Sequence, residues 1–164
     1  EEALAISDRI AVMKLGVIQQ VGTPVEIYKD PQNTFIGDFI GTSNYLKGKV
    51  IEKDSNGTRI NINNKVINMK LKNDYSGEVI VGARPEEIII ADAKKDELNG
   101  EIVIGTFLGD FINYEIRLTN DQIIEVNEYT KDVSHIRKSG DKVSLILSTD
   151  RIHIYDSTGE EVLL

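Results

Sequence analysis

From Tyr45 onward the sequence consists of short runs in which apolar and polar residues alternate, separated by turn-forming residues. Ser55-Asn56-Gly57 lies between two such runs, 50–53 and 58–62, and this arrangement is a strong β-hairpin signal. Further runs follow at 65–71, 78–83, 87–91, 101–108, 111–118, 123–126, 142–147, 151–155 and 160–164. Many short strands joined by tight turns predict a sandwich or a barrel rather than a doubly wound parallel sheet.

Residues 1–41 follow a different pattern. Apolar runs at 10–13 and 17–21 predict two short strands joined by a turn. Thr23-Pro24 predicts a helix start, because a hydroxyl caps the first turn and proline fits the first helical position. Asp30-Pro31 predicts the start of a second helix. The apolar face of this second helix is predicted to carry Phe35, Ile36, Phe39 and Ile40.

These two patterns divide the chain into residues 1–41, a linker at 42–47 and a β domain at 48–164. About 40 residues bury too little surface to form a stable core alone. The first segment is therefore expected to belong to a larger domain, and the chain to be a fragment of a longer protein. Its strands at 10–13 and 17–21 would then expose apolar edges, so we expect the isolated fragment to be at least partly dimeric.

The net charge of −8 restricts the partners that the chain can bind without specific recognition. Nucleic acid and anionic membrane surfaces would repel such a chain. The absence of cysteine excludes disulfides and thiolate metal sites. No apolar run approaches the roughly 20 residues that a membrane-spanning helix needs.

Catalytic chemistry is poorly represented in the sequence. The phosphate-binding pattern G-x-x-x-x-G-K-[ST] does not occur, and the nearest approach, 37–43, lacks the lysine and carries Asp38. The two histidines, His135 and His153, lie in different segments and have no ligand-like partner nearby in the sequence. We therefore expect this fragment to be no enzyme and to contain no catalytic residue, no cofactor site and no metal site.

Several segments together resemble the ATPase subunits of ABC importers in the maltose, polyamine and ferric-iron group. Residues 1–22 resemble the segment that follows the switch histidine of the nucleotide-binding domain, and residues 23–41 resemble the helical pair that ends it. Residues 82–88 are similar to the R-P-E-x-I signature of an accessory domain called TOBE, an OB-like β barrel. Residues 105–110 and 114–118 resemble the long hairpin of the same domain. The resemblance assigns five family-signature residues a structural role: Arg84, Pro85, Glu86, Gly109 and Tyr114.

The resemblance implies a mainly β fold, in which an OB-like TOBE barrel follows a short α+β remnant of the ABC nucleotide-binding domain. It implies that the parent subunit is a transport ATPase that binds ATP and Mg²⁺ through motifs preceding Glu1. Such a parent forms a homodimer with a second copy of itself on the cytoplasmic face of two permease subunits. The accessory domain holds the dimer together and, in some relatives, receives regulatory signals.

The junction at 39–46 resembles polyamine and iron importers more than sugar importers, so polyamine is the preferred solute and ferric iron or a sugar is the alternative. A function of another class is an OB-fold module that binds single-stranded nucleic acid or a small oxyanion. The acidic charge and an aromatic content of 6% argue against nucleic acid. An oxyanion site requires donors such as Arg84, Thr106 and Lys142 to converge, which a sequence does not reveal.

Overall fold

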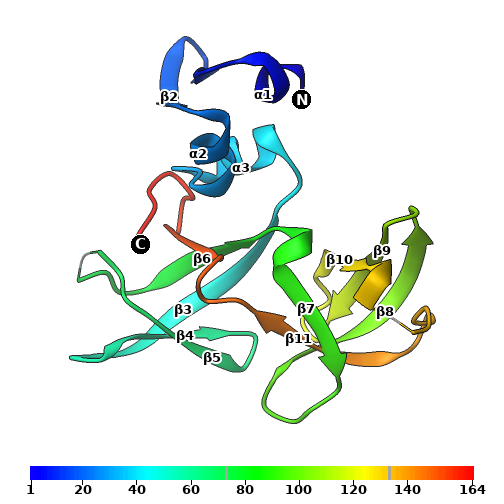
Figure 1. The fold of residues 1–164 in the computed structure, drawn as a ribbon. Helices are drawn as coiled ribbons and strands as arrows, with labels where there is room; N and C mark the ends of the chain where they lie inside the picture. Colours follow the sequence, from blue (N-terminus) through cyan, green and yellow to red (C-terminus); the bar gives the residue numbers. More distant parts are fainter. Residues whose placement is uncertain (73, 133) are drawn as a thin grey trace.

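The computed structural model describes residues 1–72, 74–132 and 134–164, and in it an N-terminal region (residues 1–43) packs on one end of a β region (residues 44–164). Figure 1 shows the N-terminal region at the top, with the C-terminus beside helices α2 and α3. None of the helices in the described ranges is long and apolar enough to cross a membrane.

The N-terminal region contains a two-stranded hairpin and three short helices. These elements are α1 (Glu2–Ile6), β1 (Ile10–Lys14), β2 (Val17–Gly22), α2 (Pro24–Lys29) and α3 (Thr34–Ile40). The two predicted strands are confirmed as the antiparallel pair β1–β2. The predicted start of α2 is also confirmed, because the Thr23 hydroxyl accepts the Glu26 backbone N–H at 3.3 Å and the Glu26 carboxylate accepts the Thr23 N–H at 2.8 Å.

The predicted start of the second helix at Asp30-Pro31 is wrong, because α3 begins three residues after Pro31, at Thr34. The cap is Asn33, whose side-chain oxygen accepts the Ile36 N–H at 3.0 Å. The predicted apolar face is only partly buried: Ile36 is fully buried, whereas Phe39 is 66% exposed.

The described residues of the β region form ten strands and two short 3-10 helices. The strands of the first sheet are β3 (Asn44–Asp54), β4 (Gly57–Ile62), β5 (Lys65–Met69), β6 (Glu78–Ala83) and β12 (His153–Asp156). Those of the second sheet are β7 (Ile88–Asp92), β8 (Leu98–Phe107), β9 (Phe111–Leu118), β10 (Ile123–Tyr129) and β11 (Lys142–Leu147). The 3-10 helices are η1 (Pro85–Glu87) and η2 (Thr130–Asp132).

Within the described residues the strand order is β12-β6-β3-β4-β5 in the first sheet and β10-β9-β8-β11-β7 in the second, and neighbouring strands are antiparallel. The second sheet curls into a half-barrel, which confirms the mainly β, OB-like architecture (Figure 1). Gly57 has a φ of 140° where β3 turns into β4, and it pairs with Asp54, so the predicted hairpin is confirmed.

Two segments differ from their predicted secondary structure. The strand β3 begins at Asn44, inside the predicted linker 42–47, because Asn44 and Tyr45 pair with the end of β6. The run 160–164 forms a single bridge, Tyr155–Val162, instead of a strand. The Asp156 carboxylate accepts the backbone N–H groups of residues 160 and 161, which makes a tight turn and leaves little backbone for a ladder.

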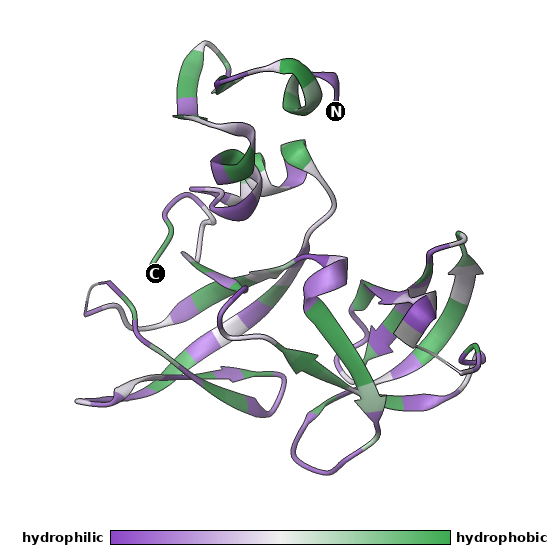
Figure 2. Cartoon of the chain, viewed as in Figure 1, coloured by the Kyte–Doolittle hydropathy of each residue, from purple (hydrophilic) through white to green (hydrophobic). Residues whose placement is uncertain are grey.

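The two regions have separate apolar cores of very different size. In the described part of the chain, 23 buried residues of the β region form one cluster to which both sheets contribute. Figure 2 shows that β7 and β11, in the middle of this region, are almost continuously hydrophobic. The buried cluster of the N-terminal region contains Val12, Ile27 and Ile36. The N-terminal region therefore depends on contacts with its surroundings for its position.

Candidate functional site

The main polar contact between the two regions is made by Arg84, which follows β6 directly. Pro85 fixes the backbone at the first position of η1, and the Arg84 N–H is accepted by the Glu87 carboxylate at 2.9 Å. The chain turns sharply there, and the Arg84 side chain enters the boundary between the regions, where the residue is 5% exposed.

The Arg84 guanidinium is satisfied by neutral groups of the N-terminal region. It donates hydrogen bonds to the Tyr28 carbonyl at 3.0 Å, to the Thr42 carbonyl at 3.3 Å and to the Ser43 hydroxyl at 3.3 Å. Its central carbon also lies 4.0 Å from the centre of the Tyr28 ring, a cation–π arrangement. A buried cation held in this way is costly to displace, because both the charge and the carbonyls would lose their partners.

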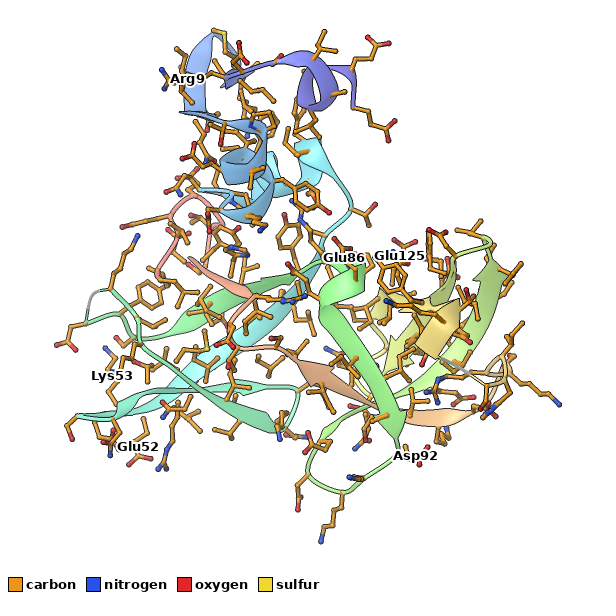
Figure 3. All side chains as sticks on the ribbon, viewed as in Figure 1. Arg9, Glu52, Lys53, Glu86, Asp92 and Glu125 are labelled. Atoms are coloured by element: carbon orange, nitrogen blue, oxygen red, sulfur yellow. The ribbon has the colours of Figure 1, made fainter. Side chains whose placement is uncertain are left out.

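Glu86 contacts the same tyrosine as Arg84. The Tyr28 hydroxyl donates to the Glu86 carboxylate at 2.6 Å. Burial, together with this carboxylate, raises the pKa of Tyr28 to about 12. Figure 3 shows Glu86 next to Glu125 of β10, at the base of the N-terminal region. Arg84 and Glu86, to which the resemblance assigned a structural role, thus meet at Tyr28.

Two tyrosines of the β region form hydrogen bonds with the segment that contains α2 and α3. The Tyr45 hydroxyl donates to the Thr34 carbonyl at 2.9 Å, and the Tyr155 hydroxyl donates to the Pro31 carbonyl at 3.0 Å. Burial raises the pKa of Tyr45 to about 12, and burial also raises the pKa of Tyr155. Gly37 permits this approach, since a Cβ at that position would collide with the Tyr45 hydroxyl.

The start of α3 also contacts the turn after β12. The Thr34 N–H and hydroxyl both donate to the Gly159 carbonyl, at 2.9 and 3.2 Å. Tyr28, Thr34, Tyr45, Arg84 and Tyr155 are called the junction below. Each junction residue takes part in a hydrogen bond between the two regions, so the directions of hydrogen bonds constrain the junction geometry.

The junction is connected to both sheets. Asn44, at the start of β3, exchanges two hydrogen bonds with the Glu125 backbone of β10, at 2.7 and 2.9 Å. Gln122, directly before β10, donates to the Tyr45 carbonyl at 2.7 Å. Asn44 and Tyr45 at the start of β3 are therefore hydrogen-bonded to the second half of the β region as well as to the first sheet.

The remaining two signature residues lie elsewhere. Gly109 is in the β8–β9 turn, where its φ of 97° suits glycine. Tyr114 is fully buried in β9, and its hydroxyl accepts the Arg137 N–H at 2.9 Å. The structure thus brings Arg84, Pro85 and Glu86 together at the junction and places Gly109 and Tyr114 in the hairpin of the second sheet.

The residues considered as oxyanion donors are not brought together in the described structure. Arg84 is occupied at the junction, Thr106 is exposed near the end of β8, and Lys142 on β11 forms an ion pair with Glu101. Conversely, sequence reasoning missed Tyr28, Tyr45 and Tyr155 as a group. No periodic signal links them, since their partners lie 11 to 124 positions away.

A search of protein families matches residues 81–154, from the end of β6 to β12, to the TOBE domain. This segment is a TOBE domain. Arg84, Pro85 and Glu86 lie at its beginning, so the junction joins the first residues of the TOBE domain to the helices of the N-terminal region.

The homologues of the chain are ATP-binding subunits of ABC importers. It is 38% identical to the Fe(3+) ions import ATP-binding protein FbpC of Fusobacterium nucleatum, over 100% of this chain and 44% of the relative. It is 33% identical to the spermidine/putrescine import ATP-binding protein PotA of Clostridium acetobutylicum, over 94% of this chain and 41% of the relative. A PotA of Mycoplasma mycoides is 38% identical over 80% of this chain and 38% of the relative. The chain spans less than half the length of these relatives.

Among solved structures, the chain is similar to the cytoplasmic molybdate-binding protein ModG with molybdate bound. The TM-score is 0.53, the sequence identity is 13%, and the match covers 69% of this chain and 95% of the ModG chain. At this identity the likeness shows a shared fold.

Proposed function

We propose that this chain is the accessory region of an ABC importer ATPase subunit, in which the TOBE domain is coupled to the ATPase domain through the junction. The single observation that carries the proposal is the buried Arg84, bonded to Tyr28 and Thr42 of the N-terminal region from the first turn of the TOBE domain. A contact of this kind would transmit force in both directions, because its hydrogen bonds are directional.

The partners and location follow from the same proposal. The parent subunit would pair with a second copy of itself and act with permease subunits on the cytoplasmic face of the membrane. ATP and Mg²⁺ would be bound outside the 164 residues, since the sequence contains no G-x-x-x-x-G-K-[ST] pattern, and this fragment would not be catalytic. The accessory region would align the dimer and receive regulatory signals.

The solute that we propose is a polyamine, with ferric iron as an alternative that the relatives support equally. The names of the Clostridium and Mycoplasma relatives favour a polyamine, whereas the name of the Fusobacterium relative favours ferric iron. Uptake of radiolabelled spermidine and of radioactive ferric iron by cells with and without the gene distinguishes them. Loss of spermidine uptake alone supports the polyamine, loss of iron uptake alone supports iron, and loss of neither contradicts both.

The coupling is tested in the purified importer that contains this chain, by measuring ATP hydrolysis and transport in parallel. We expect Arg84→Met to reduce transport per ATP hydrolysed by about tenfold. This factor corresponds to about 1.4 kcal/mol, which is within the usual range of coupling free energies between sites. Arg59→Met, which replaces an exposed side chain on β4, is the matched control and should leave the ratio unchanged. An unchanged ratio in the Arg84→Met importer would contradict the proposal.

A further inference from the structure

A groove that the junction does not use lies at the far end of the β region. It has a volume of about 540 Å³ and is walled by the β7–β8 loop, the end of β9 and the start of β11. In Figure 1 this loop lies at the bottom, opposite the N-terminal region. Small-molecule sites have volumes of about 300–1,000 Å³, so the groove is large enough for a metabolite.

The groove gathers positive charge on an acidic chain. Its ionisable lining residues are Lys94, Lys95, Arg117, Lys142, Glu101 and Asp121. Four cations therefore face two carboxylates, a surplus of two positive charges, whereas the whole chain has a net charge of −8. These six residues are called the basic groove.

Most of the cations in the basic groove have no acidic partner. Lys142 lies 2.5 Å from the Glu101 carboxylate, and this hydrogen bond lowers the pKa of Glu101. Lys94, Lys95 and Arg117 form no ion pair in the described ranges, although the charge of Arg117, opposite Glu101, also lowers the pKa of that carboxylate. Like charges that are gathered without partners repel one another, and a multivalent anion would relieve that repulsion.

The strand register places two of these cations in a row. Glu101 on β8 stands opposite Lys142 on β11 and opposite Arg117 on β9, so the three side chains lie across three adjacent strands. Residues opposite one another on antiparallel strands project from the same face of the sheet. Arg117 and Lys142 therefore approach the groove from either side of Glu101.

The β7–β8 loop, which forms the opposite wall of the groove, is held in place by hydrogen bonds to Ser144 and Asn99. The Lys94 N–H donates to the Ser144 hydroxyl at 2.8 Å, and this hydroxyl donates to the Asn99 side chain at 2.6 Å. Asn99 in turn donates to the Lys94 carbonyl at 3.0 Å. Because Ser144 is buried, the backbone of Lys94 is fixed against β11. A fixed loop lowers the conformational cost of binding.

We propose that the basic groove binds a soluble anion that carries several phosphate charges, with pyrophosphate as its simplest form. Three unpaired cations and two flanking strands suit a ligand with several oxygen acceptors better than a singly charged one. The concave shape favours a small molecule. The negative charge of the whole chain disfavours an anionic membrane surface as the source of the phosphate.

Isothermal titration of the 164-residue chain with sodium pyrophosphate at low ionic strength tests the proposal, with sodium sulfate titrated in parallel. We expect pyrophosphate to bind more tightly than sulfate and its affinity to fall as salt is added. The double variant Lys94→Gln, Arg117→Gln should weaken pyrophosphate binding by about tenfold or more. Both side chains are exposed, and thermal unfolding of the variant verifies that it folds.

The matched control is Lys70→Gln, Arg151→Gln, which removes the same charge from exposed residues that do not line the groove. This variant should retain the affinity of the original chain. No binding of pyrophosphate to the original chain would overturn the proposal, as would equal affinities in both double variants. Equal affinities for sulfate and pyrophosphate would overturn the assignment to a polyphosphate.

Discussion

The N-terminal region and the β region are held in shape by different forces. The β region buries a cluster of 23 residues within the described chain, whereas the N-terminal region buries Val12, Ile27 and Ile36. The small region keeps its helices through caps such as Thr23 and its position through the hydrogen bonds of the junction. The difference teaches that the β region is stabilised by apolar burial, whereas the N-terminal region is placed mainly by polar contacts.

A second contrast lies at the surface. Leu15 in the β1–β2 turn is 95% exposed, and its neighbours Met13, Val17 and Ile18 are exposed by 54 to 61%. An apolar surface of this kind suits contact with further protein. The expected dimerisation of the isolated chain stays a prediction, and sedimentation over a range of concentrations would test it.

The largest effect is expected from Ile116→Ala, which removes a fully buried side chain from the main cluster. A cavity there should lower the free energy of unfolding by about 3 kcal/mol, measured by urea denaturation. Ile104→Ala on β8, where the side chain is 52% exposed, should cost about 0.5 kcal/mol or less. Similar losses in both variants would contradict the conclusion that the β region is stabilised mainly by its buried cluster.

A smaller and more local effect is expected from Arg84→Met. It leaves the Tyr28 and Thr42 carbonyls without their charged donor, which should cost about 2 kcal/mol at the junction. Amide hydrogen exchange over residues 24–40 should then accelerate by about 30-fold, while exchange in β8 and β9 changes little. A uniform acceleration over the whole chain would show that the two regions unfold as one unit.

Tyr155→Phe should cost about 1 kcal/mol, because the Pro31 carbonyl loses a buried hydrogen bond without a change in packing volume. Tyr114→Phe is the matched control, since it removes a hydroxyl bonded to Arg137 within the β region. Limited proteolysis should detect loosening of residues 24–40 in the Tyr155 variant and not in the Tyr114 variant. Equal cleavage of both would contradict a role for Tyr155 in docking.

Thr23→Ala removes the cap of α2 and should destabilise that helix by about 1 kcal/mol or slightly less. The urea midpoint of the β region should hardly change, because α2 contributes little to the main cluster. Thr23→Ser, which keeps the hydroxyl, should restore hydrogen-exchange protection of α2. Failure of serine to restore it would show that the methyl group, rather than the cap, matters.

The last effect is confined to alkaline pH. The pKa of Tyr45 is raised from 10.0 to about 12, so its contribution to stability is complete below pH 10 and is lost as the pH rises through 12. A tyrosinate cannot donate to the Thr34 carbonyl. Tyr45→Phe should therefore make the urea midpoint fall less steeply between pH 10 and 12. An identical slope in the variant would assign the alkaline loss to other groups.

Local features of the fold could be predicted from the sequence. The hairpin around Asn56-Gly57 and the cap formed by Thr23 and Glu26 each depend on residues within a few positions of one another. The start of α3 could not be predicted as well, because Asp30-Pro31 and Asn33 offer competing caps. The Pro31 carbonyl accepts a hydrogen bond from Tyr155, 124 positions away, and the sequence around Pro31 does not indicate this contact.

The site was less accessible to sequence reasoning than the fold. Arg84, Pro85 and Glu86 were identified by resemblance, and no alternation or spacing indicated that Arg84 would reach Tyr28 and Thr42, which are 56 and 42 positions away. The roles of Tyr28, Tyr45 and Tyr155 could not be predicted either, because burial of a hydroxyl depends on the tertiary structure. Long-range polar contacts of this kind become visible only when the sheets are assembled.

The bond between Thr34 and Gly159 has a consequence for synthesis of the chain. The two residues are 125 positions apart, so the helices leave the ribosome long before the turn that holds the start of α3 has been translated. Until then Pro31 lacks the hydrogen bond from Tyr155 and Thr34 lacks its bond to Gly159, and the apolar side chains of α3 are open to chaperones. A mutation that slows translation of the codons for residues 41–159 would prolong that exposed interval.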